Sequence, residues 1–122
     1  MNINYEIFDR KGFKKRPVIN FEDKKYIGLE DLLNVDNSLI TIDDILEKIK
    51  IVEEEKSDFE EIGNERSLLE IRKDQSTISD MFEGIIDDNE LYPIIHIDTL
   101  KLKDIVLKWK DARKKLMNEI HE

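Results

Sequence analysis

The sequence lacks cysteine altogether, and it contains only four glycines and two prolines among its 122 residues. Without cysteine the chain can form neither a disulfide bond nor a thiolate metal site, so nothing in it indicates an oxidising compartment. So few glycines, none of them clustered, exclude a glycine-rich phosphate-binding loop. We therefore expect a cytoplasmic protein that does not bind nucleotides through such a loop.

Long apolar runs are also missing. No stretch approaches the roughly 20 apolar residues that a membrane-spanning helix needs. The chain starts Met1-Asn2-Ile3-Asn4, without the basic start and apolar segment of a secretory signal. We expect neither a membrane-spanning segment nor export by that route.

Histidine, the commonest general base, occurs only at positions 96 and 121. His121 lies one residue from the end of the sequence, where fraying disfavours an organised site. His96 stands between two isoleucines on a predicted strand, so its side chain should point away from the core. No cysteine or nucleophile motif is present to pair with it, and we expect no catalytic residues. An enzyme that uses scattered carboxylates is a minor alternative.

The acidic residues form no recognisable metal-binding motif. Asp36 and Glu47 have the spacing of the first and last ligands of an EF-hand loop, but Thr41 stands where the central glycine belongs. The run Asp87-Asp88-Asn89-Glu90 is typical of a polar turn, with weak calcium binding as the alternative. We expect neither a metal ion nor a cofactor.

The net charge of −9 is unevenly distributed along the chain. Residues 26–98 carry a net charge of −15, whereas residues 10–25 carry +5 and residues 99–122 carry +3. So acidic a middle section attracts a basic protein surface and repels a phosphate backbone, although a solvated, solubilising surface is an alternative explanation. We expect a protein partner and no direct nucleic-acid contact. Nucleic-acid binding by the basic segment Arg10 to Lys25 is an alternative that the overall charge disfavours.

The first third of the chain predicts a β-hairpin. Residues 3–8 alternate apolar and polar side chains, residues 9–12 form a turn signal that ends in Gly12, and residues 17–21 predict the returning strand. A short helical turn is expected at residues 30–33. Residues 34–38 are then expected to form a polar connection.

Two amphipathic helices and a meander follow from the remaining pattern. Apolar residues from Ile42 to Val52 recur at helical spacing, with Thr41 as the cap and an end near Lys56, before a turn at Gly63-Asn64. Three antiparallel strands are predicted at residues 67–72, 77–82 and 92–97. The last helix begins at Asp98 or Thr99 and carries one apolar stripe, formed by Leu102, Ile105, Val106, Trp109, Ala112, Leu116 and Ile120.

These elements predict a single α+β domain over residues 1–122. A mainly antiparallel meander packs against two long helices, the second at the C-terminus. Trp109 lies in the middle of the strongest apolar stripe, and we expect it to be at least partly buried between helix and sheet.

The densest group of acids lies where the first long helix ends. Phe59 and Ile62 interrupt it, and an acidic rim around an apolar anchor suits recognition of a basic protein. Alternatively, the two apolar residues fold into the core and the acids only face water. The predicted partner-binding residues are Glu53, Glu54, Glu55, Asp58, Phe59, Glu60 and Glu61, with Glu65 in the same acidic group.

The segment from Glu90 to Thr99, followed by residues 100–115 with Trp109 in mid-helix, resembles the ending of many bacterial immunity proteins. The resemblance covers residues 66–117. It implies an inhibitor from a contact-dependent growth inhibition or polymorphic toxin system, which binds and neutralises a cognate toxin, a nuclease domain with a basic cleft, in the cytoplasm. The basic segment from Arg10 to Lys25 departs from a uniformly acidic design. The alternative is an acidic DNA mimic or regulatory protein that binds a nucleic-acid-processing enzyme.

Overall fold

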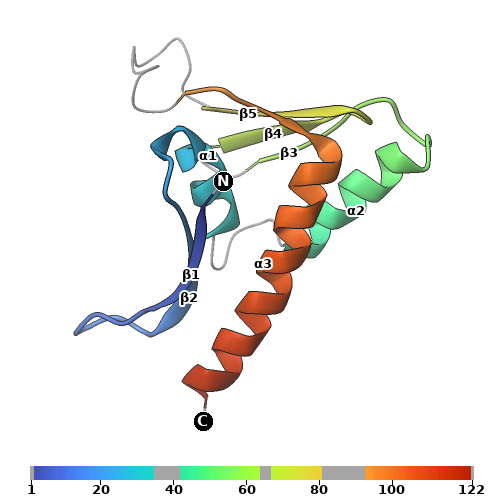
Figure 1. Cartoon of the computed structure of the whole chain (residues 1–122). Helices are drawn as coiled ribbons and strands as arrows, with labels where there is room; N and C mark the ends of the chain where they lie inside the picture. The colour runs from blue at the N-terminus through green and yellow to red at the C-terminus, as the bar shows by residue number, and fades with distance from the viewer. Residues whose placement is uncertain (1, 35–41, 64–66, 81–92, 122) are drawn as a thin grey trace.

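The computed structural model describes residues 2–34, 42–63, 67–80 and 93–121 (Figure 1). Within these ranges the chain is an α+β protein, as predicted from its sequence. In chain order the elements are β1 (Ile3–Phe8), β2 (Arg16–Phe21), the 3-10 turn η1 (Lys24–Tyr26), α1 (Ile27–Leu33), α2 (Ile42–Glu53), β3 (Glu60–Gly63), β4 (Ser67–Ile71), β5 (Gln75–Asp80), β6 (Ile95–Asp98) and α3 (Thr99–Ile120).

The described strands form two sheets. β1 and β2 make the predicted hairpin, and β3, β4, β5 and β6 form a separate antiparallel meander in chain order. The meander has one strand more than the sequence predicted, because Glu60–Gly63 pairs with β4 where a turn at Gly63-Asn64 was expected. The expectation of two long helices holds only for α3, with 22 residues, since α2 has 12 and ends three residues before Lys56.

Two strands start at other positions than predicted. β5 begins at Gln75 instead of residue 77, because Gln75 and Ser76 already pair with Asp98 and Ile97 on β6. β6 begins at Ile95. The predicted strand ends at residues 82 and 92 lie outside the described residues, as do the Thr41 cap and most of the 34–38 connection.

The main core lies between the meander and the helices, which are all on one side of it (Figure 1). The buried apolar side chains alternate along each central strand, as expected for a sheet that packs on one face only. The strands contribute Leu69, Ile71, Ile78, Ile95 and Ile97, and the helices contribute Leu29, Leu32, Leu33, Ile45, Ile49, Val52, Leu102, Ile105, Val106 and Trp109.

A buried polar network joins the start of α3 to the meander. The Thr99 hydroxyl donates to the carbonyl of Arg72 over 2.5 Å and lies 2.8 Å from the Ser76 hydroxyl. The Thr99 amide donates to the carbonyl of Asp74 over 3.1 Å. The bond to Asp74 satisfies one of the backbone amides that a helix start leaves unpaired, and Asp98 makes no side-chain capping bond.

Trp109 is buried, as its place in the apolar stripe predicts, with 1% of its surface exposed. Its indole N-H donates to the carbonyl of Leu33 at the end of α1 over 3.1 Å. On the other side its ring stacks on Tyr5 of β1, with 5.9 Å between centroids. One side chain therefore joins α3, α1 and the hairpin.

The hairpin is attached to α1 through the free edge of β2. The Asn34 side chain accepts from the Ile19 amide and donates to the Ile19 carbonyl, both over 2.8 Å. One helical turn earlier, Glu30 accepts from the Phe21 amide over 2.9 Å. Four residues along a helix span about 6 Å and two along a strand about 6.8 Å, so side chains at this spacing can reach alternate residues of one strand.

Candidate protein-binding face of the meander

The face of the meander turned away from the helices, called here the outer face, is covered by no described element (Figure 1). Strand alternation places on it the side chains that lie between the buried positions. The strand registers align four of them in one row across the sheet: Glu61 opposite Glu70, Glu70 opposite Thr77 and Thr77 opposite His96. The outer face is therefore an ordered, mainly polar surface.

The row begins with two carboxylates directly opposite each other. Glu61 is exposed and Glu70 half-buried, and among the described residues neither forms an ion pair. Like charges at directly opposed strand positions destabilise a sheet. The chain therefore carries at this point a local repulsion that a cation from outside could relieve.

Phe59 flanks this pair just before β3 begins. Its side chain is 36% exposed, and the guanidinium carbon of Arg72 lies 4.7 Å from the centre of its ring. The Ser57 hydroxyl oxygen accepts from the Phe59 amide over 3.3 Å. Ile62, the other apolar residue of the acidic group, is half-buried and packs against the core. Phe59 is thus partly exposed, as an apolar anchor would be, whereas Ile62 folds towards the core.

The acids at the end of α2 are paired with bases of the same chain. Glu53 accepts from Lys103 of α3 over 2.9 Å, and Glu54 lies 2.8 Å from Lys56. Glu55 pairs with Lys73 in the turn between β4 and β5. The hydrogen bonds from Lys56 and Lys73 lower the pKa values of Glu54 and Glu55, respectively, so both remain ionised at neutral pH.

The turn that ends α2 fixes the position of Glu55. The Glu55 amide bonds to the Val52 carbonyl and the Lys56 amide to the Ile51 carbonyl, which is the Schellman pattern. Glu55 therefore has a φ of 59°, a left-handed value that favours glycine. The turn directs the chain from α2 back towards β3.

Strand alternation also separates Glu60 from its neighbour Glu61. Glu60 turns towards α2, where it accepts from Lys48 over 3.1 Å and from the Ser57 hydroxyl over 3.0 Å. These two hydrogen bonds lower the pKa of its carboxyl. Glu61 lies on the outer face instead. The cluster that is continuous in sequence is thus divided in space.

Of the seven predicted partner-binding residues, Glu53, Glu54, Glu55 and Glu60 have charges that are compensated by lysines. Asp58, Phe59 and Glu61 remain available at the surface, and Asp58 is exposed without an ion-pair partner among the described residues. Glu65 lies outside those residues. Sequence reasoning missed Glu70 and Arg72, although the alternation of residues 67–71 could have placed Glu70 on the outer face.

His96 ends the row on β6. The isoleucines on either side are buried and His96 itself is exposed, so the predicted orientation is confirmed. Ile94, just before the strand, is 44% exposed. His96 therefore adds a surface group at the opposite end of the row from the acidic pair.

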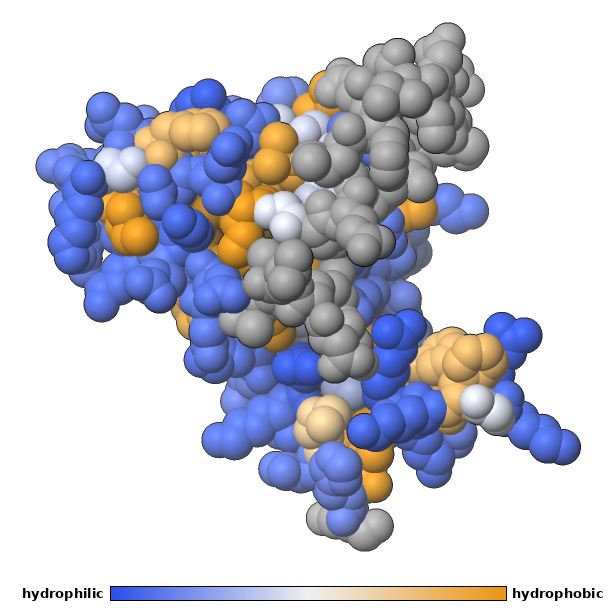
Figure 2. Space-filling view, turned by 180° about the vertical axis from the view of Figure 1, so that it is seen from behind, coloured by the Kyte–Doolittle hydropathy of each residue, from blue (hydrophilic) through white to orange (hydrophobic). Residues whose placement is uncertain are grey.

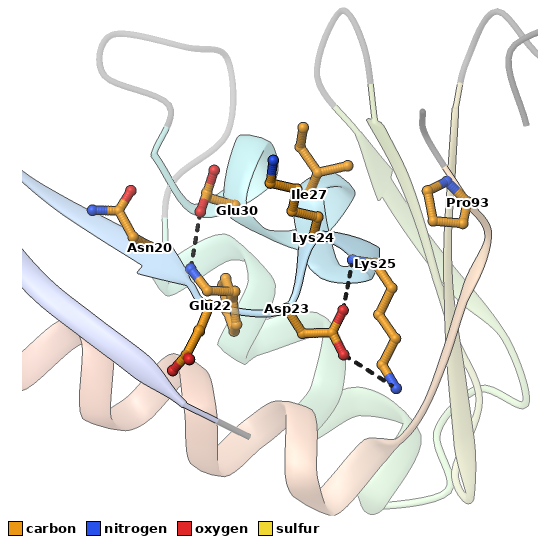
Figure 3. Close-up of a pocket in the computed structure, with 9 residues that line it drawn as sticks. Asn20, Glu22, Asp23, Lys24, Lys25, Ile27, Glu30 and Pro93 are labelled. Atoms are coloured by element: carbon orange, nitrogen blue, oxygen red, sulfur yellow. Dashed lines mark hydrogen bonds and ion pairs between the residues drawn. The ribbon is translucent and has the colours of Figure 1, made fainter. Parts of the chain in front are cut away.

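A separate hollow of about 640 Å³ lies beside β2 and α1 (Figure 3). Three of its charged side chains already have structural partners: Glu30 binds the Phe21 amide, and Asp23 accepts from the Lys25 amide over 3.0 Å and lies 3.7 Å from the Lys25 ammonium. The carboxylates of Glu30 and Asp23 therefore serve the local fold. The outer face is the stronger candidate site.

The described ranges contain no group of three or more histidine, aspartate or glutamate side chains that could hold a metal ion. Residues 36–41 and 87–90, considered above for calcium, lie outside them. None of the helices described is long and apolar enough to cross a membrane. In comparisons with known proteins, no family model, curated protein or solved structure matches the chain.

Proposed function

We propose that the protein acts by binding another protein, with the outer face as the contact surface. The observation that carries this proposal is the opposed pair Glu61 and Glu70 on a sheet face that no described element covers. A basic partner surface would convert their repulsion into attraction, since each carboxylate would gain a counter-ion. The partner chemistry that fits is therefore a cluster of lysine or arginine side chains.

Phe59 and Arg72 complete this surface. Interfaces concentrate their affinity in a few aromatic and arginine side chains surrounded by weaker polar contacts. Phe59 has a partly exposed ring held against Arg72, so its immobilisation on binding costs little additional side-chain entropy. In this arrangement Phe59 anchors the partner, while Asp58, Glu61 and Glu70 accelerate its approach.

The biological role that we propose is that of a bacterial immunity protein. It would bind and neutralise a cognate toxin, a nuclease domain with a basic cleft, in the cytoplasm. Support comes from the resemblance of residues 66–117 to such proteins and from the acidic pair. A basic cleft that holds nucleic acid offers the counter-charges that Glu61 and Glu70 lack.

The ion pairs at the end of α2 favour a dedicated partner over general imitation of DNA. A DNA mimic requires a continuous series of uncompensated negative charges, because the phosphates of DNA are evenly spaced. Here Glu53, Glu54 and Glu55 each have a lysine of the same chain within 2.9 Å or less. The acids at the end of α2 therefore do not form such a series.

A charge-reversal experiment tests the contact surface. Glu61→Lys combined with Glu70→Lys should slow association with the toxin domain encoded by the neighbouring gene by about tenfold at low salt, and the difference should shrink as salt screens the charges. The matched control is Asp31→Lys with Glu47→Lys, which changes the net charge equally at exposed positions on α1 and α2. Circular dichroism checks that both variants fold.

Equal slowing by the two double variants would show that net charge alone matters and would exclude the outer face as the contact. The role itself is tested separately, by co-expressing the protein with the toxin domain in bacteria and measuring growth. Rescue of growth by the wild-type protein supports an immunity function. Inhibition of several unrelated DNA-binding enzymes, without a toxin gene nearby, would favour the DNA-mimic alternative.

A further inference from the structure

The end of the β1–β2 hairpin differs in chemistry from the outer face. This segment, residues 8–16, is called here the hairpin tip. It contains five bases and a single acid, Asp9. Phe13 is 62% exposed, and Lys11 and Lys14 beside it are exposed as well. A large aromatic side chain held in water among cations stabilises no core, so folding does not explain its position.

The aromatic and guanidinium groups of the tip are arranged against one another. The Arg10 guanidinium carbon lies 5.6 Å from the centre of the Phe13 ring, and that of Arg16 lies 5.4 Å from the Phe8 ring. The two rings meet edge to face, with 6.2 Å between centroids. Gly12, with a φ of +88°, allows the turn that is closed by the bond from the Phe13 amide to the Arg10 carbonyl.

The positive charge of the tip is largely uncompensated. On α3, by contrast, Lys103, Lys108, Lys110 and Lys115 each have an acidic partner within 3.1 Å. Among the described residues the tip has one ion pair, a loose contact of 3.8 Å between Lys15 and Asp9. Arg10 and Arg16 rest on aromatic rings, which leaves their charges free to attract an anion.

The tip also projects away from the acidic meander. In Figure 1 the hairpin extends beside α3 towards the opposite end of the molecule from the sheet, and Figure 2 shows, at the lower right, an apolar group surrounded by hydrophilic side chains at its end. Interactions between exposed charges weaken beyond a Debye length of about 10 Å at 0.1 M salt. An anion at the tip is therefore partly shielded from the acids of the meander.

From these observations we infer that the hairpin tip binds single-stranded nucleic acid. The exposed Phe13 ring offers a surface on which one unpaired base can stack, while Arg10, Lys11 and Lys14 neutralise the adjoining phosphates. An acidic protein surface would pair with the arginine and lysine side chains but would give the exposed Phe13 ring no nucleobase to stack on. Such a surface is therefore the weaker fit. The inference departs from the expectation that the net charge suggested, because charge at the tip is opposite in sign to the total.

Fluorescence anisotropy with a labelled oligothymidylate of about 20 nucleotides tests the inference directly. The wild-type protein should bind at about 50 mM salt, and with roughly three phosphates neutralised the logarithm of its affinity should fall with the logarithm of salt at a slope near −2. Phe13→Ala should weaken binding by about tenfold, because it removes the stacking surface and leaves every charge in place. Phe13→Tyr should restore most of it.

The charge contribution has its own matched pair of variants. Lys11→Glu with Lys14→Glu should abolish measurable binding, whereas Lys101→Glu with Lys114→Glu changes the net charge equally at exposed positions of α3 and should reduce binding far less. All substituted side chains are exposed, so folding should be retained in each variant, as circular dichroism would verify.

Three results would overturn the inference: no binding by the wild-type protein at low salt, equal losses in the two double variants, or unchanged binding by Phe13→Ala. Competition with polyglutamate distinguishes a nucleic acid from an acidic protein as the partner of the tip. Displacement of the oligonucleotide by polyglutamate at equal charge concentration would mean that the tip recognises acidic chains in general. None of these results bears on the outer face, which lies at the other end of the molecule.

Discussion

Trp109 connects three parts of the molecule through one side chain. Its ring packs between α3 and the hairpin, and its N-H bonds to the end of α1. Replacement by alanine leaves a large cavity and an unpaired carbonyl at Leu33. We predict that Trp109→Ala lowers the free energy of unfolding by about 3 to 5 kcal/mol, measured by urea denaturation.

Leu107, an exposed residue two positions before Trp109, provides the control. It is 45% exposed on the same helix, so Leu107→Ala should change the unfolding free energy by less than about 0.5 kcal/mol in addition to any helix-propensity effect. If the two variants have the same denaturant midpoint, Trp109 does not have the structural role assigned to it.

Glu60 should make the stability of the fold depend on pH in the acid range. Hydrogen bonds from Lys48 and Ser57 lower its pKa in the folded protein from the usual value of 4.5. A carboxyl of this kind stabilises the fold at pH values above 4.5, and that contribution is lost as the pH falls through the lower folded value. Glu60→Gln should therefore flatten the decline in unfolding temperature between roughly pH 5 and pH 3.

The comparison variant for this titration is Glu47→Gln. Glu47 is exposed on α2 and has no ion-pair partner among the described residues, so its removal should leave the decline as steep as in the wild-type protein. Scanning fluorimetry across the pH series provides the measurement. Equally steep curves for Glu60→Gln and Glu47→Gln would show that the contacts of Glu60 do not contribute to acid sensitivity.

At the scale of elements, the attachment of β2 to α1 depends on Asn34. Loss of its amide leaves the buried Ile19 N-H and C=O without partners, and each such group costs about 1 to 3 kcal/mol. We predict that Asn34→Ala destabilises the protein by about 2 kcal/mol and speeds hydrogen exchange at the Ile19 amide. Asp31→Ala, exposed on the same helix, should do neither. Slow exchange at Ile19 in Asn34→Ala would contradict this account.

Elements with strong local periodicity were predicted well, because their pattern alone specifies a buried face. The pattern of α3 predicted a start at Asp98 or Thr99, and the helix begins at Thr99; its stripe also predicted the burial of Trp109. β3 was missed because Glu60–Gly63 has one apolar side chain among acids, so its strand form depends on pairing with β4. Nothing in the local sequence of these four residues indicates that they pair with β4.

The candidate site was harder to predict for the same reason. Lys103 and Lys73 reach Glu53 and Glu55 at the end of α2 from distant positions in the sequence, and Lys48 of α2 pairs with Glu60 of β3. Glu70 faces Glu61 only in one strand register. A run of acids in sequence therefore could not show which charges are compensated. The exposed position of His96 could be predicted, since it required only the alternation of one strand.

Viewed as a whole, the molecule separates two proposed contact surfaces of opposite charge. The acidic pair on the outer face and the basic hairpin tip lie at opposite ends, with the helices and their internal ion pairs between them (Figure 1). Such an arrangement orients an approaching charged partner before contact. The two proposed surfaces can therefore be examined one at a time, because changes at one end should leave the other end folded and charged as before.

The bonds from Glu30 and Asn34 to β2 have a further consequence for behaviour at high concentration. A two-stranded sheet exposes backbone groups along its outer side, and such groups can recruit a strand from a neighbouring molecule. Here two side chains occupy the positions that an added strand would use at Ile19 and Phe21. A strand from another molecule must first displace the Glu30 and Asn34 side chains. These two residues therefore oppose fibre growth by strand addition along this side of the hairpin.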